Sequence, residues 1–175
     1  MAKLFLMMGA PGSGKSTWVQ KNLKPDDIYI SRDKIRFSIL QEGEEYFSHE
    51  PKVFNTFVEQ INSALMLNIS NHIRVFADAS HLNPASRAKL LNKIEAYRDE
   101  TNVIWLRTPL MICYQRNDNR EGRAKVPHSI IKSMYDSQQE PSYREGINKV
   151  YIIDGKTEEL KILELGGKNE EEFKF

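Results

Sequence analysis

The chain has 175 residues, of which 40% are hydrophobic and 28% charged, and its formal net charge is +1. This is the composition of a folded globular protein. The near-neutral charge excludes a general nucleic-acid-binding protein, whose domains usually have a pI above about 9. Cys113 is the one cysteine, which excludes a disulfide within the chain. Because the N-terminal apolar run is also too short for a signal peptide, we expect a cytoplasmic protein.

Short apolar runs alternate along the chain with longer helical patterns. The first run, 4–8, is continuously apolar and ends in glycine, which is typical of a strand buried on both faces. The other predicted strands are 27–30, 73–77, 103–106 and 150–153. The predicted helices are 16–23, 32–41, 51–71, 84–98, 109–119 and 127–138, with loops at 43–49 and 120–126.

Five strands that alternate with helices predict an α/β fold, with a mostly parallel sheet sandwiched by helices. Residues 1–156 are expected to form this domain. Residues 157–175 are expected to be a C-terminal appendage, in which the apolar positions from Leu160 to Leu165 could add an edge element. The charged end, 166–175, is expected to fray.

The segment 9–17, GAPGSGKST, has the spacing of a P-loop and lies between a predicted strand and a predicted helix, as this motif requires. Its glycines allow backbone N–H groups to approach phosphate oxygens closely, and the helix N-terminus adds a favourable dipole. A glycine-rich turn without a ligand is the alternative that the flanking elements disfavour. We therefore expect a site for ATP and Mg²⁺. Its expected residues are Gly9, Gly12, Ser13, Gly14, Lys15, Ser16 and Thr17.

Three side chains of this segment have expected roles in catalysis. Lys15 is placed to reach the β- and γ-phosphates, and Ser16 to ligate Mg²⁺ through its hydroxyl group. Thr17 is placed to hydrogen-bond another phosphate oxygen.

Charged residues also follow the second and third predicted strands, whose carboxyl ends face the ligand crevice of a parallel sheet. Phosphoryl transfer needs a carboxylate that accepts the proton of the attacking hydroxyl, and Asp33 suits that role. Arg32 and Arg36 are candidates for binding a phosphate or carboxylate of the acceptor. Asp78 could orient Mg²⁺-bound water or an acceptor-side arginine. Alone, Asp33 would be an ordinary acid in a helix first turn and Asp78 the start of a loop, but the P-loop favours the functional interpretation.

The segment 116–127 carries four cations between two predicted helices. A solvated charged loop is the usual explanation for such a run. Here it stands where a lid could close over the triphosphate, and an arginine there would stabilise the charge that develops in the transition state. Arg120 is the first candidate for this role and Arg123 the second.

These motifs together resemble the kinase domain of phage-type 5′-polynucleotide kinases. The matching segments are GAPGSGKSTW, SRDKIR, DASHLN, QRNDNREGRAKVP and IIKSMYDS, which occur in the family's order and cover about residues 3–140. The resemblance implies a P-loop NTPase fold of the nucleoside-kinase-like kind. It also implies ATP-dependent phosphorylation of the 5′-hydroxyl end of DNA or RNA.

The resemblance implies a role for individual residues as well. Asp33 would be the general base, and Arg36 would contact the phosphate 3′ of the acceptor nucleoside. Asp78 would support the acceptor side, and a lid arginine would bind the ATP phosphates. Arg116 and Val126 would flank the adenine.

Two departures from the family pattern keep the acceptor open. The lid is one residue longer than usual, and Lys34 stands where the family often has a second carboxylate. A P-loop kinase of a small-molecule hydroxyl, such as a sugar, a nucleotide-sugar or an antibiotic, is therefore an alternative. A non-catalytic nucleotide-binding switch is a further one, since fold alone does not define function. The polynucleotide 5′-hydroxyl kinase is the favoured hypothesis.

Overall fold

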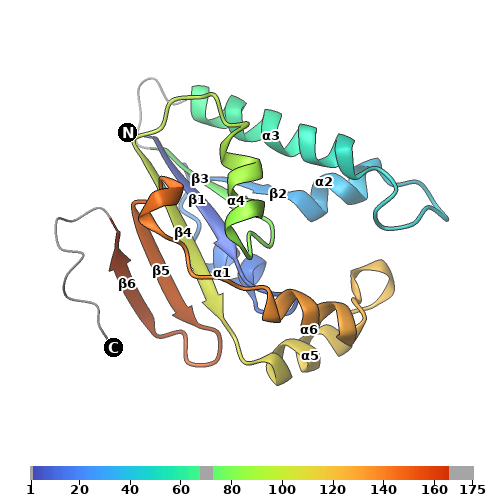
Figure 1. Ribbon diagram of the computed structural model, residues 1–175. Coiled ribbons are helices and arrows are strands. Elements are labelled where there is room, and N and C mark those ends of the chain that lie inside the picture. Colours follow the sequence, from blue (N-terminus) through green and yellow to red (C-terminus); the bar gives the residue numbers. More distant parts are fainter. Residues whose placement is uncertain (1, 68–72, 166–175) are drawn as a thin grey trace.

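The computed structural model describes residues 2–67 and 73–165, which form a central sheet with helices on both faces (Figure 1). The strands are β1 (Ala2–Met8), β2 (Ile28–Ser31), β3 (Ile73–Asp78), β4 (Glu100–Arg107), β5 (Lys149–Asp154) and β6 (Leu160–Glu164). The α-helices are α1 (Lys15–Asn22), α2 (Arg32–Ile39), α3 (Glu50–Met66), α4 (Pro84–Leu91), α5 (Leu110–Asp118) and α6 (His128–Asp136). Two 3₁₀ turns are η1 (Gly122–Ala124) and η2 (Tyr143–Glu145). The frayed end expected at 166–175 lies outside the described residues.

The strand order is β2-β3-β1-β4-β5-β6, and the first five strands are parallel. The predicted α/β fold is therefore confirmed. The predicted number of strands was one too low, because β6 pairs antiparallel with β5 at the edge of the sheet. The Asp154 carboxylate accepts hydrogen bonds from the backbone N–H groups of Lys156 and Thr157, and this tight turn brings the chain back for β6.

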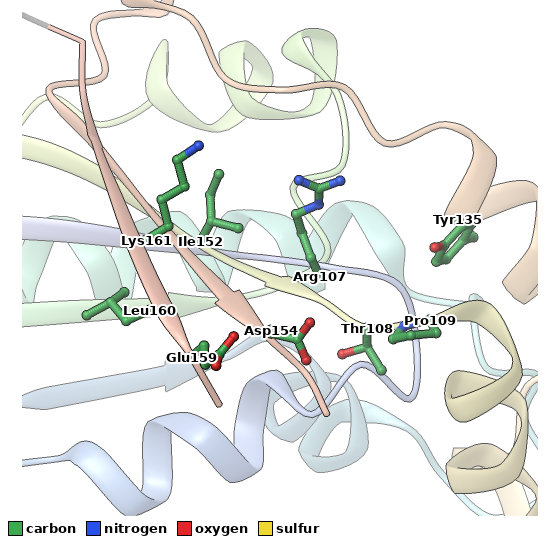
Figure 2. Close-up of a pocket in the computed structure, with 9 residues that line it drawn as sticks. All are labelled: Arg107, Thr108, Pro109, Tyr135, Ile152, Asp154, Glu159, Leu160 and Lys161. Atoms are coloured by element: carbon green, nitrogen blue, oxygen red, sulfur yellow. The ribbon is translucent and has the colours of Figure 1, made fainter. Parts of the chain in front are cut away.

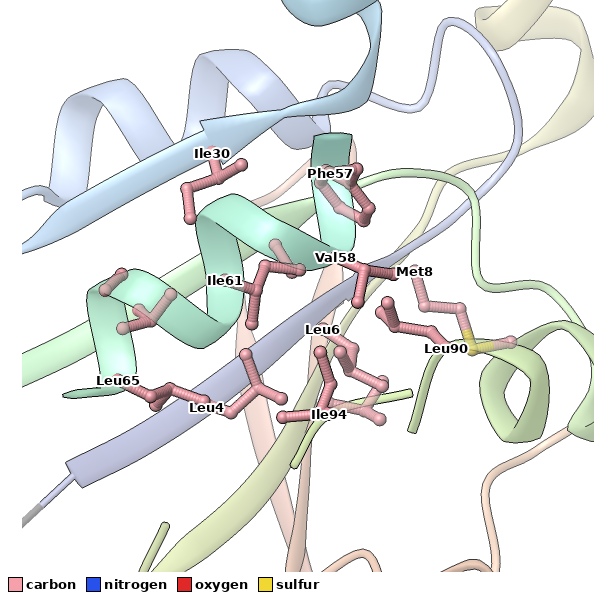
Figure 3. Close-up of a cluster of buried hydrophobic side chains, with 14 of the residues drawn as sticks. Leu4, Leu6, Met8, Ile30, Phe57, Val58, Ile61, Leu65, Leu90 and Ile94 are labelled. Atoms are coloured by element: carbon pink, nitrogen blue, oxygen red, sulfur yellow. The ribbon is translucent and has the colours of Figure 1, made fainter. Parts of the chain in front are cut away.

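The apolar character of β1 follows from the two layers of helices that cover it. Leu4 and Leu6 point to the face covered by α3 and α4, where they pack with Phe57 and its neighbours (Figure 3). Phe5 points to the opposite face and packs with Val19 of α1. Both faces of β1 are thus covered by packed side chains, and the candidate site residues lie at the carboxyl edge of the sheet.

Helix α4 was predicted to reach residue 98, but it ends at Leu91. Beyond it the chain turns so that Ile94 enters the core, where it is 7% exposed. The side-chain amide of Asn62 on α3 holds this turn, because its oxygen accepts from the N–H groups of Glu95 and Ala96, each at 3.0 Å. A tertiary contact therefore overrides the helical pattern of the sequence.

The other helix ends differ from the prediction by smaller amounts. Helix α2 ends at Ile39, two residues early, and Leu40 has an extended backbone conformation. The last residue of α3 is Met66, whereas the prediction continued to 71 and so falls partly on residues outside the described ranges. None of the helices within 2–67 and 73–165 is long and apolar enough to cross a bilayer.

Candidate active site

The P-loop connects β1 to α1, and its glycines have conformations that other residues rarely adopt. Gly12 has φ +81° and lies against α5. A Cβ atom there would be 2.3 Å from the carbonyl oxygen of Cys113, so glycine is required at this position. Gly14 has φ +96° and is the N-cap of α1. The loop is therefore folded tightly around the first turn of α1, as the motif predicts.

Residues far along the chain hold this loop from the other side. The carbonyl oxygen of Ser13 accepts a hydrogen bond from the Thr108 hydroxyl at 2.8 Å and from Arg116 Nη1 at 3.1 Å. Arg116 Nη2 also donates to the carbonyl of Gly155 at 2.8 Å. A Cβ atom on Gly155 would lie 1.6 Å from the Thr108 hydroxyl oxygen, so the two elements approach as closely as glycine permits. Arg116 thus ties α5 to the P-loop and to the loop after β5.

The Lys15 ammonium group lies within the P-loop, where it donates to the backbone carbonyls of Gly9 at 2.7 Å and Ala10 at 3.1 Å. Burial lowers the pKa of Lys15, whereas the negative charges of Asp78 and Asp33 act to raise it. The positive charge of Arg120 acts in the same direction as burial. The candidate base, the acid at the end of β3 and the lid arginine therefore all lie within electrostatic reach of Lys15.

Ser16 and Asp78 form the part of the site that could hold Mg²⁺. Asp78 ends β3, next to β1, and the Ser16 hydroxyl donates to its Oδ2 at 2.6 Å. Mg²⁺ at nucleotide sites takes oxygen ligands from one or two side chains, completed by phosphate oxygens and water. These two oxygens fit that pattern. In the described residues no cluster of three or more His, Cys, Asp or Glu could hold a metal ion by itself.

Tyr29 on β2 is a member of this group that the sequence did not reveal. Its hydroxyl donates to Asp78 Oδ2 at 2.5 Å. Burial raises the pKa of Tyr29 to about 12, and the charge of Asp78 acts in the same direction. The phenol therefore stays protonated at neutral pH and orients the Asp78 carboxylate.

On the acceptor side, Asp33 lies in the first turn of α2 with its side chain 67% exposed. It forms an ion pair with Arg36, one turn further along the helix. The hydroxyl of Tyr46 donates to Asp33 Oδ1 at 2.7 Å and accepts from Arg36 Nη1 at 2.7 Å. The candidate base is therefore open to solvent and fixed by two neighbours.

Glu50, at the first turn of α3, holds both acceptor-side arginines. It accepts from Arg36 Nε at 2.7 Å and from Arg32 Nη2 at 2.6 Å. Arg36 is 4% exposed, and although burial alone would lower its pKa, hydrogen bonding to Glu50 raises it. Arg36 is thus a buried, permanently charged anchor beneath Asp33.

The segment predicted to be a lid begins within α5, and Asn117 joins its two ends. This buried side chain donates to the carbonyl of Val126 at 2.8 Å and accepts from the Val126 N–H at 2.9 Å. Arg120 is exposed and lies between Asn117 and Val126 in sequence, and its Nη1 donates to the Ala124 carbonyl at 3.5 Å. Arg123 is in η1, and its side chain is outside the described part of the structure.

A pocket of about 690 Å³ lies near these elements but contains none of the predicted site residues. Figure 2 shows Arg107 of β4, Ile152 of β5 and Lys161 of β6 on one side of the sheet, with Tyr135 of α6 across from them. Both signs of charge line the pocket, since Asp154 is also part of it. Thr108 lines this pocket and also contacts the P-loop, because its hydroxyl donates to the Ser13 carbonyl.

The predicted site residues thus converge at the carboxyl edge of the sheet, and sequence analysis missed several of their partners. The partners are Tyr29, Tyr46, Glu50, Thr108, Asn117 and Gly155. Glu50 carried a weak signal as an acid at a helix start, and Tyr46 lay in a segment interpreted as a polar loop. Thr17 is exposed at the start of α1.

Known proteins are similar to this chain at two levels. The sequence is 27% identical over 147 residues to L-seryl-tRNA(Sec) kinase of Methanococcus maripaludis, which covers 79% of this chain and 53% of that kinase. The chain therefore spans about half the length of this relative.

Solved structures share the fold. A chain of the Pnkp1/Rnl/Hen1 RNA repair complex has a TM-score of 0.60 at 19% identity, covering 97% of this chain and 50% of that one. An unliganded sugar kinase from Janibacter sp. HTCC2649 has a TM-score of 0.57 at 17% identity, covering 89% of this chain and 86% of that one. Finally, the model of the family described as AAA domain matches residues 4–141, which include the P-loop, the acceptor-side residues and the lid. The chain therefore belongs to the AAA domain family, and the P-loop that its motifs predicted lies within the matched residues.

Proposed function

We propose that this kinase transfers the γ-phosphoryl group of ATP to the 5′-hydroxyl end of DNA or RNA. The observation that carries the proposal is the Asp33–Arg36 pair on α2, within electrostatic reach of Lys15. Asp33 is two-thirds exposed, so a hydroxyl at the end of a long chain can reach it without entering an enclosed cavity. The name of the seryl-tRNA kinase relative and the RNA repair complex among the structural neighbours are consistent with an acceptor that includes RNA.

In this proposal Asp33 Oδ accepts the proton of the acceptor hydroxyl, whose oxygen attacks the γ-phosphorus in line with the departing ADP oxygen. Lys15 binds the β- and γ-phosphates, and Arg120 stabilises the negative charge that develops on these phosphates in the transition state. Ser16 and Asp78 hold the metal site. Mg²⁺, when bound there, neutralises phosphate charge. Arg116 and Val126 flank the adenine. Arg36, which pairs with Asp33, contacts the phosphate 3′ of the acceptor nucleoside.

The test is transfer of labelled γ-phosphate from ATP to a short single-stranded oligonucleotide with a 5′-hydroxyl. The wild-type protein should label the oligonucleotide. Asp33→Asn should lose at least about 10²-fold in kcat, because general-base catalysis contributes about 10²–10⁴-fold. Asp26→Asn is the matched control, since Asp26 is an exposed acid at the amino end of β2, the opposite edge of the sheet. Full activity in Asp33→Asn would refute the assigned base.

A kinase of a small-molecule hydroxyl is the second candidate, and the fold shared with a sugar kinase favours it. Both hypotheses require Lys15 and Asp33, but they differ in the acceptor. Mg·ATP binding without any label on the oligonucleotide would support the small-molecule candidate. ADP formation that depends on an added sugar would then identify its class.

A further inference from the structure

Three aromatic side chains gather beside the candidate base, and two of them are unusually exposed. Phe37 on α2 is 44% exposed, and Phe47, in the loop between α2 and α3, is 67% exposed. Tyr46 lies between them, with ring centroids 5.9 Å from Phe37 and 4.8 Å from Phe47, both in edge-to-face geometry. We call Phe37, Tyr46 and Phe47 the aromatic platform.

The aromatic platform is joined directly to the acceptor side of the site. The Tyr46 hydroxyl is hydrogen-bonded to Asp33, and the guanidinium carbon of Arg36 lies 4.3 Å from the Tyr46 ring centroid and 5.6 Å from that of Phe47. These contacts fix the rings, since edge-to-face and cation–π pairs each contribute about 0.5–1.5 kcal/mol. The platform is therefore an ordered apolar surface rather than a set of unconstrained side chains.

Its location also follows from the topology. Helix α2 and the loop that follows it project from the carboxyl edge of the sheet, the edge that also carries α5, η1 and α6 (Figure 1). An acceptor whose 5′-oxygen lies at Asp33 must leave the site past these elements. The aromatic platform lies directly beside this position, because the Tyr46 hydroxyl is hydrogen-bonded to Asp33.

We propose that the aromatic platform stacks the nucleobases at the 5′ end of a single-stranded acceptor. This inference rests on the proposed function and specifies how the acceptor is held. Aromatic faces bind bases without regard to sequence, and a nearby guanidinium strengthens the attraction for a nucleotide.

The charge of the chain supports this mode of binding. A net charge of +1 provides little of the counterion release that drives most nucleic-acid binding, so non-electrostatic contacts must supply more of the affinity. The two exposed phenylalanines next to the candidate base supply such contacts. Exposed apolar side chains grouped in this way are typical of an interaction site.

The test compares two single-stranded acceptors of the same length, each with a 5′-hydroxyl. One carries normal bases, and in the other the two 5′-terminal nucleotides are abasic. For the wild-type protein we expect the KM of the abasic acceptor to be about tenfold higher, equivalent to about 1.4 kcal/mol, within the range of about 1–3 kcal/mol for stacking of one base. The kcat value and the KM of ATP should not change.

The variants locate the effect. The double substitution Phe37→Ala and Phe47→Ala should raise the KM of the normal acceptor about tenfold and abolish the difference between the two acceptors. Phe37→Leu and Phe47→Leu replace the alanine variant if it does not fold. They keep the apolar volume but remove the flat ring, so they should also weaken the discrimination between the two acceptors. Tyr97→Ala is the matched control: Tyr97 is 79% exposed but precedes β4, at the opposite edge of the sheet, and this variant should behave as wild type.

The outcomes separate this inference from the proposed function. If wild type phosphorylates both acceptors with equal KM, or if the platform variants discriminate as strongly as wild type, stacking on the aromatic platform is refuted and the 5′-kinase assignment stands. If wild type labels neither acceptor while it still binds Mg·ATP, the proposed function fails and this inference fails with it.

Discussion

At the scale of single residues, the site depends on charges that the fold holds close together. Asp78 accepts hydrogen bonds from Ser16 and Tyr29, and Asp33 is held by Arg36 and Tyr46. Each carboxylate therefore has two fixed neighbours, which limits the orientations that it can take. Such preorganised groups need little rearrangement when charge develops during phosphoryl transfer.

Lys15 is the residue whose removal should have the largest effect on transfer. In Lys15→Ala no ammonium group remains to bind the β- and γ-phosphates, so we expect kcat to fall at least about 10²-fold. The measurement is γ-phosphate transfer at saturating ATP, with Lys21→Ala as the control. Lys21 is on the same helix but exposed, and it pairs with Glu158. Undiminished activity in Lys15→Ala would contradict the P-loop assignment.

His81 should make the stability of the protein depend on pH. Burial lowers the pKa of His81 to about 3, and nearby cations, Arg32 first among them, act in the same direction. The unfolded chain, with a pKa near the ordinary 6.5, therefore binds a proton that the folded protein does not. The free energy of unfolding should fall as pH drops below about 6.5, by about 1.4 kcal/mol per pH unit from this residue.

Replacement of this imidazole tests the argument. His81 has φ +44°, which asparagine tolerates, so His81→Asn should fold and should lose less stability between pH 7 and pH 5 than wild type. Urea unfolding at several pH values measures the difference. Parallel losses in both proteins would assign the pH dependence to other groups.

At the scale of elements, the P-loop is shaped by its contact with α5. Gly12 and Gly43 have nearly the same φ, +81° and +84°, but only Gly12 lies against backbone. A Cβ atom on Gly12 would meet the Cys113 carbonyl at 2.3 Å, whereas nothing lies within 4 Å of one on Gly43. A comparison of alanine substitutions at the two positions therefore separates the cost of backbone strain from the cost of steric overlap.

We expect Gly12→Ala to destabilise the protein by about 1–3 kcal/mol more than Gly43→Ala, because only the first must push α5 away. It should also weaken ATP binding at least about tenfold, since the phosphate-binding N–H groups move with the loop. Thermal unfolding and ATP titration of both variants provide the measurement. Equal losses in the two variants would mean that backbone strain alone, without the contact with α5, accounts for the effect of Gly12→Ala.

Two further segments show that an element can depend on distant side chains. Beyond the end of α4, Asn62 of α3 binds the N–H groups of Glu95 and Ala96, and Asn117 of α5 binds the backbone of Val126. In both cases one amide side chain replaces backbone hydrogen bonds that a longer helix or a turn would otherwise make.

At the scale of the whole molecule, Arg87 joins segments that are far apart in sequence. It is completely buried on α4 and donates to Glu145 of η2 at 2.6 and 3.0 Å. It also donates to the carbonyls of His81 and Gln139, each at 3.1 Å. Arg87 thus links the loop after β3 to the chain that follows α6.

Removal of Arg87 should therefore destabilise the fold without altering the chemistry. Arg87→Ala leaves Glu145 without its partner in a mostly buried position, and breaking such a pair typically costs about 3–5 kcal/mol. Arg144→Ala, at an exposed neighbouring position, should change the free energy of unfolding by less than about 0.5 kcal/mol. Urea unfolding tests both, and the KM of ATP in the folded fraction should stay at the wild-type value. A loss below about 1 kcal/mol for Arg87→Ala would show that water replaces the guanidinium.

The sequence by itself determined the α/β alternation and the P-loop, because both are encoded by neighbouring residues. Five parallel strands lie where the apolar runs predicted them, and 9–17 forms the loop between β1 and α1. The motifs after the second and third strands also predicted that Asp33 and Asp78 lie at one edge of the sheet, since carboxyl ends of parallel strands share that edge.

Only the tertiary structure decided which residues support this site. Tyr46 meets Asp33, Glu50 meets Arg36, and Thr108 meets the P-loop across 13, 14 and 95 positions of sequence, respectively. The antiparallel β6 and the early end of α4 were decided in the same way. These contacts depend on how packed helices and strands bring distant side chains together, and no local pattern of spacing or polarity records that geometry.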